Sequence, residues 1–228
     1  MKTKLIFPLA FLMLSLFSTT LSAQYCTTGG ASNPYDSNIE SVSLLGDAAT
    51  FITHTGCNGT VGELGIGDST LTQIVNVTAG SAYTANIQFG TCGGNYGSVG
   101  EAWIDWNQND AFDASESIGT WTGTPPTTLS AFAFTVPVGA YNGATRMRVI
   151  QWEGGNLPLN PCGSFTYGSA VDFTVVVSGG ITLTCPAPSS LTSNTPTTTS
   201  INLAWTENGS APSWQIEYGP LGFSQGTG

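Results

Sequence analysis

Short apolar stretches separated by turn residues recur along this chain, and they constrain its fold more than any other feature. They fall at residues 39–45, 71–77, 83–89, 101–106, 129–136, 145–152 and 170–177, between turns rich in Gly, Asn, Pro and Ser. Alternation is clearest at 146–150, where Arg146 and Arg148 share one face and the apolar residues share the other. Beyond residue 23 no segment keeps a helical period. We therefore expect an all-β fold, an antiparallel β-sandwich.

The N-terminus has the features of a signal peptide. Lys2 and Lys4 precede an apolar run at 5–17, and Ala23 ends a group of small residues that suits cleavage. The run is shorter than the roughly 20 residues that span a bilayer. We expect residues 1–23 to be removed, the protein to be secreted or held at a bacterial cell surface, and no membrane insertion after cleavage.

Acidic residues outnumber basic ones, 14 to 4. Lys2 and Lys4 leave with the signal peptide, so Arg146 and Arg148 are the basic residues that remain. Phosphate binding needs clustered Lys or Arg, which argues against nucleic acid and anionic lipid as partners. Cations are the charged ligands that such a chain attracts.

The amino-acid composition of the sequence changes near residue 179. We expect a first β-sandwich domain at 24–178, a linker at 179–184 and a second segment at 185–228 that is rich in Thr, Ser and Pro at its start. In the second segment Ile201, Leu203 and Trp205 alternate as one strand. A further strand is expected at 214–218, where Trp, Ile and Tyr alternate.

Oxygen-bearing side chains are concentrated between residues 101 and 116. With Asp105 at position 1, oxygen ligands fall at positions 1, 3, 5, 7, 9 and 12, the spacing of a calcium loop, with a backbone carbonyl at position 7. The predicted Ca²⁺ ligands are Asp105, Asn107, Asn109, Ala111, Asp113 and Glu116. Position 6, usually glycine, is Asp110, a residue type that tolerates left-handed backbone. The alternative is an Asp/Asn-rich turn whose side chains bond to their own backbone.

The sequence shows no catalytic constellation. His54 is the single histidine, and an isolated histidine in a strand is far more often structural than catalytic. The motifs of serine hydrolases, zinc proteases and phosphate loops are missing. The sequence does not exclude two carboxylates that come together in the folded protein, as the catalytic pair of a glycosidase does. We expect no enzymatic activity in this segment.

Three of the 6 tryptophans suggest a second kind of site. Trp106, Trp121 and Trp152 are candidates for a ligand platform, because aromatic faces stack on the apolar faces of sugars. The alternative is that these indoles pack in the core.

All 5 cysteines lie in the exported part, where an oxidising compartment permits disulfides. We expect Cys26, Cys57, Cys92 and Cys162 to form two bridges, with Cys185 unpaired in this chain. Four cysteines allow three connectivities, and sequence does not choose among them. A preference for neighbours in sequence gives Cys26–Cys57 and Cys92–Cys162.

Several ordered motifs between residues 25 and 177 are similar to those of the GEVED domain. They are the run 103–113, Phe134-Thr-Val-Pro, 145–149, Pro161-Cys-Gly, and Tyr167-Gly. That family is found in secreted bacterial proteins, often of the Bacteroidetes. At the name-giving motif, residues 168–172 keep the glycine and the final Asp172 but lose both glutamates, so the role of those glutamates does not carry over.

Residues 185–228 resemble the opening of a fibronectin type III domain, of the kind that starts with Cys-Pro and carries the strand at 214–219. Such a sandwich needs seven strands, so about half of it is expected beyond residue 228. The resemblance also implies a C-terminal signal for type IX secretion.

Taken together, these features predict a non-catalytic, calcium-stabilised structural or adhesive module of a secreted bacterial protein, with an extracellular protein or polysaccharide as partner. The alternatives are a carbohydrate-binding module, and an accessory domain of a secreted protease or hydrolase whose catalytic part is not in this chain.

Overall fold

The computed structural model describes residues 25–57, 62–125, 127–182, 189–193, 200 and 202–206. Strands dominate, and they are β1 (Gly30–Asn33), β2 (Ser37–Leu45), β3 (Phe51–Thr55), β4 (Ile66–Asp68), β5 (Ile74–Thr78), β6 (Ala82–Thr91), β7 (Ser98–Ile104), β8 (Ser117–Gly123), β9 (Ser130–Thr135), β10 (Gly143–Glu153), β11 (Ser164–Ser178), β12 (Ser189–Ser193) and β13 (Leu203–Thr206). Two 3-10 turns, η1 (Asp47–Ala49) and η2 (Ala114–Glu116), are the helical elements among these residues. The expected all-β fold is confirmed.

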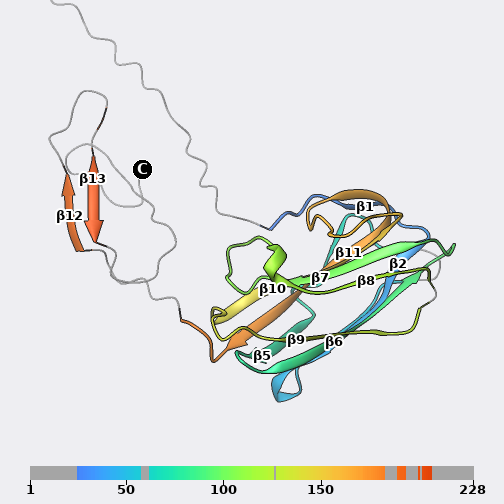
Figure 1. Cartoon of the computed structure of the whole chain (residues 1–228), viewed down its shortest axis with the longest axis horizontal. Helices are drawn as coiled ribbons and strands as arrows, with labels where there is room; N and C mark the ends of the chain where they lie inside the picture. Colours follow the sequence, from blue (N-terminus) through green and yellow to red (C-terminus); the bar gives the residue numbers. More distant parts are fainter. Residues whose placement is uncertain are drawn as a thin grey trace, which may run out of the picture.

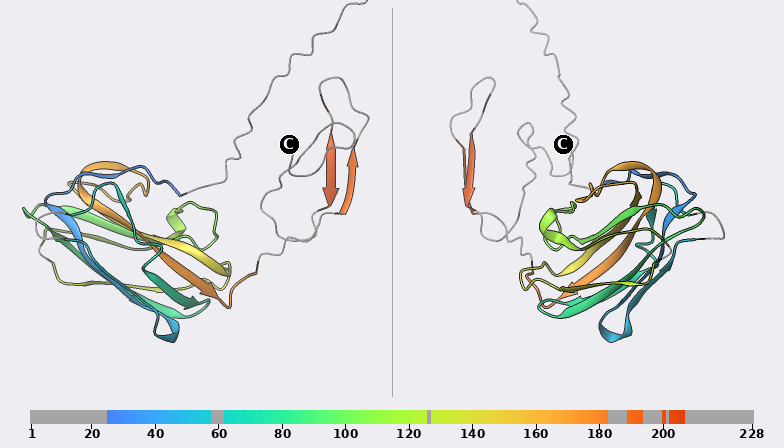
Figure 2. Two further views of the ribbon diagram at one scale, coloured as in Figure 1. Left: turned by 180° about the vertical axis from the view of Figure 1, so that it is seen from behind. Right: turned by 45° about the vertical axis from the view of Figure 1, so that its right-hand side comes forward.

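The strands from β1 to β11 form a sandwich of two layers (Figure 1). The hydrogen-bonded order is β8-β7-β10-β11-β5-β3-β2-β6-β9, with β1 and β4 also paired to β11. One layer holds β8, β7, β10 and β11, and the other holds β3, β2, β6 and β9. Figure 2 shows the two layers from behind and from the side.

Strand alternation explains the main core between the layers. In β11 the buried side chains of Val171, Phe173, Val175 and Val177 face inward, and they meet Ile39, Val42 and Leu44 of β2. Successive strand residues point to opposite faces, so β11 contributes every second residue to this core, and β2 does so after a bulge between Ile39 and Ser41. Burial of such a cluster is the main source of folding free energy in a domain of this size.

A second, smaller core lies on the other face of β7, β10 and β11. It contains Ala31, Val99, Trp103, Phe112, Ile150, Leu159, Phe165 and Ala170. The segment around Tyr25, strand β1 and the loops that carry Phe112 and Leu159 cover this face. One sheet is therefore covered on both sides.

The sheet is mixed rather than wholly antiparallel. Strand β11 pairs antiparallel with β10 but parallel with β1, β4 and β5. Parallel neighbours need long connections, and here the connections from β1, β4 and β5 pass through the rest of the sandwich before the chain returns as β11. The register of such distant pairs leaves no local pattern in the sequence.

Each of the seven expected strands of the first domain is present, with shifted ends. Strand β8 was not expected, because Gly119 and Gly123 interrupt its pattern. In the second segment β12 pairs antiparallel with β13, and β13 overlaps the alternating stretch around Trp205. The strand expected at 214–218 and Cys185 lie outside the described residues, and the fibronectin type III resemblance and the domain limits stay predictions.

The start of the linker is bonded to the first domain. Asn142 donates its backbone N–H to the Ile181 carbonyl at 2.8 Å, and Ile181 donates to the Ala140 carbonyl at 2.8 Å. The Asn142 side chain accepts from the Gly180 N–H at 2.8 Å and donates to the Thr182 hydroxyl at 2.8 Å. These bonds fix residues 180–182 against the turn before β10.

Candidate metal centre

The loop of residues 105–116 connects β7 to β8 on the side of the second core. Phe112 anchors it, with its ring 5.2 Å from the Tyr25 ring and 6.4 Å from the Trp103 indole, measured between centroids. The Arg148 guanidinium lies 5.0 Å from the centre of the same phenyl ring. Beside this apolar anchor, Asn107, Asn109 and Asp113 are exposed, whereas the two end residues Asp105 and Glu116 are buried.

Asp105 begins the loop and is fully buried. Its Oδ1 accepts the Asn109 N–H at 3.3 Å, and its Oδ2 accepts the Asp110 N–H at 3.1 Å and the Tyr25 hydroxyl at 2.5 Å. Burial raises the pKa of the Asp105 carboxyl, and these hydrogen bonds oppose that rise.

Glu116 closes the loop at the end of η2 and is also buried. Its Oε1 accepts the N–H groups of Trp106 at 2.8 Å and Asn107 at 3.2 Å, and its Oε2 accepts the Asp113 N–H at 3.0 Å. Burial raises the pKa of Glu116, and the negative charge of Asp105 raises it further. The hydrogen bonds from Asp113 and Asn107 oppose this rise.

The residues between them form a chain of local bonds. Asn107 Oδ1 accepts the Asn109 N–H at 3.0 Å, and Asn109 Oδ1 accepts the Ala111 N–H at 2.9 Å. The side-chain amides of Asn107 and Asn109 donate to Asp113 Oδ2 at 3.2 and 3.3 Å. Positions 3, 5 and 9 are thus bonded to one another within the loop.

Asp110 takes the place of the glycine at position 6. Its φ of 62° is in the left-handed region, and Gln108 has a φ of 49°. Aspartate reaches this conformation more readily than most residues. Asp110 therefore makes the sharp turn that a calcium loop requires at this position.

The donor set fits an oxygen-ligated cation better than a transition metal. Among the described residues no three Asp, Glu, His or Cys side chains form a group able to hold a metal ion by themselves. Carbonyl and amide oxygens, from Ala111, Asn107 and Asn109, would have to complete the site. Calcium accepts such mixed oxygen ligands in irregular geometry, whereas zinc favours nitrogen and sulfur.

The tryptophans predicted as a platform lie on different surfaces. Trp121 is opposite Gly100 and Trp152 is opposite Val99, and neighbouring residues of β7 point to opposite faces. Trp121 stacks on Phe89 at 4.6 Å in the main core, whereas Trp152 stacks on Phe165 at 5.7 Å in the second. Trp106 is buried in the main core. The platform prediction is therefore wrong, because strand register separates the indoles.

The four expected cysteines form two disulfides, which confirms the expected set but not the pairing. The bridges are Cys26–Cys162 and Cys57–Cys92. Cys57 and Cys92 follow β3 and β6, which flank β2, and Cys26 and Cys162 precede β1 and β11, which pair with each other. Strand neighbourhood, and not sequence neighbourhood, decides the connectivity.

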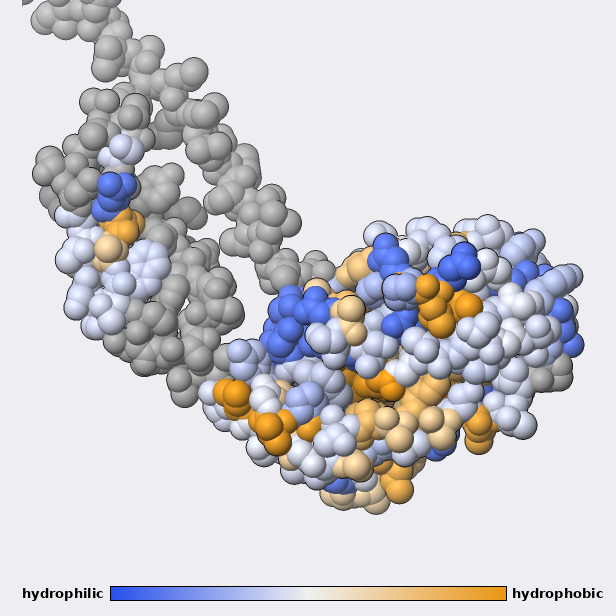
Figure 3. Space-filling view, in the orientation of Figure 1, coloured by the Kyte–Doolittle hydropathy of each residue, from blue (hydrophilic) through white to orange (hydrophobic). Residues whose placement is uncertain are grey.

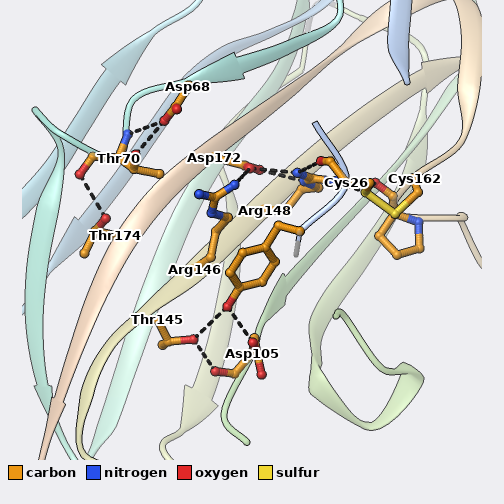
Figure 4. A network of polar contacts seen from close by, with 12 residues as sticks. Cys26, Asp68, Thr70, Asp105, Thr145, Arg146, Arg148, Cys162, Asp172 and Thr174 are labelled. Carbon is orange, nitrogen blue, oxygen red and sulfur yellow. Dashed lines mark hydrogen bonds and ion pairs between the residues drawn. A yellow bond between two sulfur atoms is a disulfide. The ribbon is translucent and has the colours of Figure 1, made fainter. Parts of the chain in front are cut away.

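A buried ion pair beside the loop was missed in the sequence. Arg148 is fully buried, and its Nε and NH2 donate to the two Asp172 carboxylate oxygens at 2.6 and 2.7 Å (Figure 4). Its remaining donors reach the carbonyls of Pro161 at 2.8 Å and Cys26 at 2.9 Å. Arg146 adds a bond to Asp172 at 3.0 Å and lies over the Tyr25 ring. Asp172 is the acidic residue in the otherwise uncharged strand predicted at 170–177. That feature could have indicated a buried ion pair with an arginine of the neighbouring strand.

The same network explains what the 168–172 motif does here. Asp172 faces the second core with Arg148, whereas Ser169 and Val171 point to the main core. Ser169 accepts the Ile39 N–H through its hydroxyl at 2.8 Å, and Val171 packs among apolar residues. The two positions that lack glutamate thus face the interior of the sandwich.

The loop, Arg148, Cys162 and Asp172 all fall in the part of the chain from β7 to β11. Residues 100–176 match the GEVED domain family. The match confirms the GEVED resemblance for this part of the chain and indicates a non-catalytic accessory module. No curated protein matches the chain. A Bacteroidetes origin stays a prediction.

Three further observations bear on location and chemistry. The two disulfides fit an oxidising, extracellular compartment. No helix among the described residues has the length and apolar character needed to cross a membrane. His54 packs edge-on against Phe173 at 5.5 Å, its Nε2 lies 4.0 Å from Glu63 Oε1, and burial lowers its pKa. These contacts are those of a core histidine.

Proposed function

We propose that the first β-sandwich is a calcium-stabilised, non-catalytic module of a secreted or cell-surface bacterial protein, with a structural or adhesive role. The observation that carries the proposal is the arrangement of the 105–116 loop. Oxygen-bearing residues occupy each position of a calcium loop, and Asp110 supplies the left-handed turn between them.

Electrostatics gives the cation its stabilising effect. Asp105 and Glu116 are buried close together, and Asp113 receives the amides of Asn107 and Asn109. Like charges held in one loop cost free energy unless a cation offsets them. A calcium ion would have to draw the carboxylates of Asp105, Asp113 and Glu116 together, because in the structure these side chains do not form a metal-holding group. Amide and carbonyl oxygens would complete its coordination.

The loop also connects the cation site to the rest of the fold. Phe112 covers the second core, and Gln108 donates its side-chain amide to the Tyr141 carbonyl at 2.8 Å. Tyr141 precedes Asn142, which bonds to the linker. A cation that orders the loop would therefore stabilise both the second core and the place where the chain leaves the domain.

Thermal melting with and without calcium tests this function. A ligand that binds only the folded state adds RT ln(1 + [L]/Kd), about 2.7 kcal/mol when calcium is 100 times its Kd. We expect calcium to raise the Tm and EDTA to lower it. Asp105→Ala should abolish the response, and Asp113→Asn provides a second variant, because Asp113 is exposed and its loss perturbs the fold less.

Asp68→Asn is the matched control, since Asp68 is an exposed aspartate outside the loop. It should respond to calcium as the unmodified protein does. Identical melting curves of the unmodified protein in calcium and in EDTA would refute the calcium role and leave the 105–116 segment as a self-bonded turn.

A further inference from the structure

The layer opposite the loop presents a broad surface without charged side chains. We call it the outer face, and its residues are Ser41, Ser43 and Leu45 of β2, Phe51, Thr53 and Thr55 of β3, Ile74 of β5, Thr84, Asn86 and Gln88 of β6, and Ala131 and Ala133 of β9. Two acids border this set: Glu40 lies at the β2 bulge against Gly90, and Asp47 follows β2 and accepts the Thr78 hydroxyl at 2.7 Å. A neutral face is unexpected in a chain of formal net charge −10.

Strand register places three exposed apolar side chains in one row of this face. Leu45 pairs with Phe51, and Phe51 pairs with Ile74. Their exposed fractions are 68, 57 and 42%. Apolar residues gathered on neighbouring strands, rather than scattered singly, mark a contact surface.

A shallow hollow of about 450 Å³ lies next to this row. It is lined by Ser43, Leu44, Leu45, Phe51, Ile52, Thr53, Thr84 and Asn86. A second hollow, of about 300 Å³, continues across β6 and β9 and shares Thr84 with the first. Volumes of this order suit a small organic ligand or a few units of a chain.

The polar groups at the hollow are available to a ligand. The side chains of Ser43, Thr84 and Asn86 make no hydrogen bond to other described residues. They line the same hollow as the exposed Phe51 ring and supply hydroxyl and amide groups to it. This combination of an apolar surface and a few uncharged donors and acceptors is the usual composition of a site for a neutral polar ligand.

The other sheet does not offer a comparable surface, because the second core and its covering segments occupy its outward side. Figure 3 shows hydrophobic and weakly polar residues gathered on the lower surface of the first domain, over β6 and β9. Within the described part of the chain, the outer face has no comparable covering layer, although Gln88 at its edge bonds to the Thr127 carbonyl at 3.1 Å.

We propose that the outer face binds a neutral polysaccharide. An anionic partner would lose hydration at this face without gaining a countercharge, and so would a cationic one. A sugar chain carries both the apolar C–H faces that pack on Phe51 and Leu45 and the hydroxyls that bond to Ser43, Thr84 and Asn86. This ligand class would give the module an adhesive role that does not depend on the calcium loop.

Affinity gel electrophoresis of the whole chain tests the proposal. The probes are hydroxyethyl cellulose, xylan, galactomannan and mixed-linkage β-glucan as neutral polymers, with alginate as the anionic comparison. We expect at least one neutral polymer to retard the protein and alginate to have no effect. Phe51→Ala and Thr84→Glu should each weaken the retardation at least 10-fold. Leu71→Ala should not, because Leu71 is 91% exposed but lies outside the outer face.

Melting curves of each variant verify that the fold is retained. Retardation should persist in Asp113→Asn, which separates this proposal from the calcium function. No retardation by any neutral polymer would overturn the proposal, and so would equal retardation of the unmodified protein, Phe51→Ala and Thr84→Glu. A dimer in solution that Thr84→Glu dissociates would also overturn it, since a second copy would then occupy the face.

Discussion

Arg148 and Asp172 lie opposite each other on β10 and β11 and form a bidentate ion pair that is almost fully removed from solvent. The pair lies between the disulfide Cys26–Cys162 and the 105–116 loop (Figure 4). Its geometry satisfies the guanidinium with two carboxylate oxygens and two backbone carbonyls, which is what a buried charge requires.

Removing one partner of this pair should destabilise the domain strongly. We expect Asp172→Asn to lower the free energy of unfolding by about 3–5 kcal/mol, because it leaves the buried Arg148 without a countercharge. Arg148→Met should lower it by less, because Asp172 keeps its bond to Arg146 at 3.0 Å. Urea denaturation measures the change. The double variant Arg148→Met/Asp172→Leu should recover much of the loss, and a loss below about 1 kcal/mol in both single variants would show that the pair is unimportant.

The disulfide connectivity can be read directly by peptide mapping. Mass spectrometry of a non-reduced digest should show peptides that join Cys26 to Cys162 and Cys57 to Cys92. The bridges span 136 and 35 residues, and chain-entropy estimates give about 5 and 4 kcal/mol for loops of these lengths. Peptides joining Cys26 to Cys57 would contradict the strand neighbourhood described above.

Gly100 should not accept a larger residue. A Cβ at this position would lie 2.2 Å from the Phe89 ring, which is buried and stacked on Trp121. We expect Gly100→Ala to cost about 1–3 kcal/mol through overpacking. Gly139→Ala is the control, since no atom lies within 4 Å of a Cβ there. Equal stability of the two variants would contradict the close packing of Phe89 on Gly100.

His54 should make stability depend on pH in a predictable direction. Burial lowers the pKa of His54 below its ordinary value of 6.5 in the folded state. As the pH falls, the unfolded chain therefore binds a proton at His54 before the folded chain does. Stability is therefore full above pH 6.5 and is lost as the pH falls below it, by at most about 1.4 kcal/mol per pH unit for one proton.

The comparison with His54→Gln isolates this effect from other groups, including Glu63, whose pKa burial raises. Urea denaturation between pH 7.5 and 5.5 should show the unmodified protein losing stability relative to the variant. Parallel pH profiles of the two proteins would contradict a buried, uncharged His54.

Local patterns predicted the features that depend on neighbours in sequence. Alternation at 146–150 placed both arginines on one face, where both bond to Asp172. The spacing from Asp105 to Glu116 predicted a calcium loop, and this stays a prediction. Both follow from short-range geometry, namely the two-residue period of a strand and the winding of one loop.

Features that depend on strand order could not be predicted in this way. The partners of Cys26 and Cys57 are set by which strands lie side by side, and the separation of Trp121 from Trp152 is set by their register on β7. The parallel pairing of β5 with β11 joins segments about a hundred residues apart. The packing of the whole sandwich determines which distant strands pair and in which register. These pairings leave no local pattern in the sequence.

The central claim is that the 105–116 loop binds calcium, and a calorimetric titration of the whole chain with CaCl₂ tests it most directly. We predict one calcium ion per chain, with a Kd no weaker than about 10⁻³ M. Asp113→Asn should weaken binding at least 10-fold, and Asp68→Asn should bind as the unmodified protein does. The absence of calcium binding at millimolar concentration, or equal binding by Asp113→Asn and the unmodified protein, would contradict the claim.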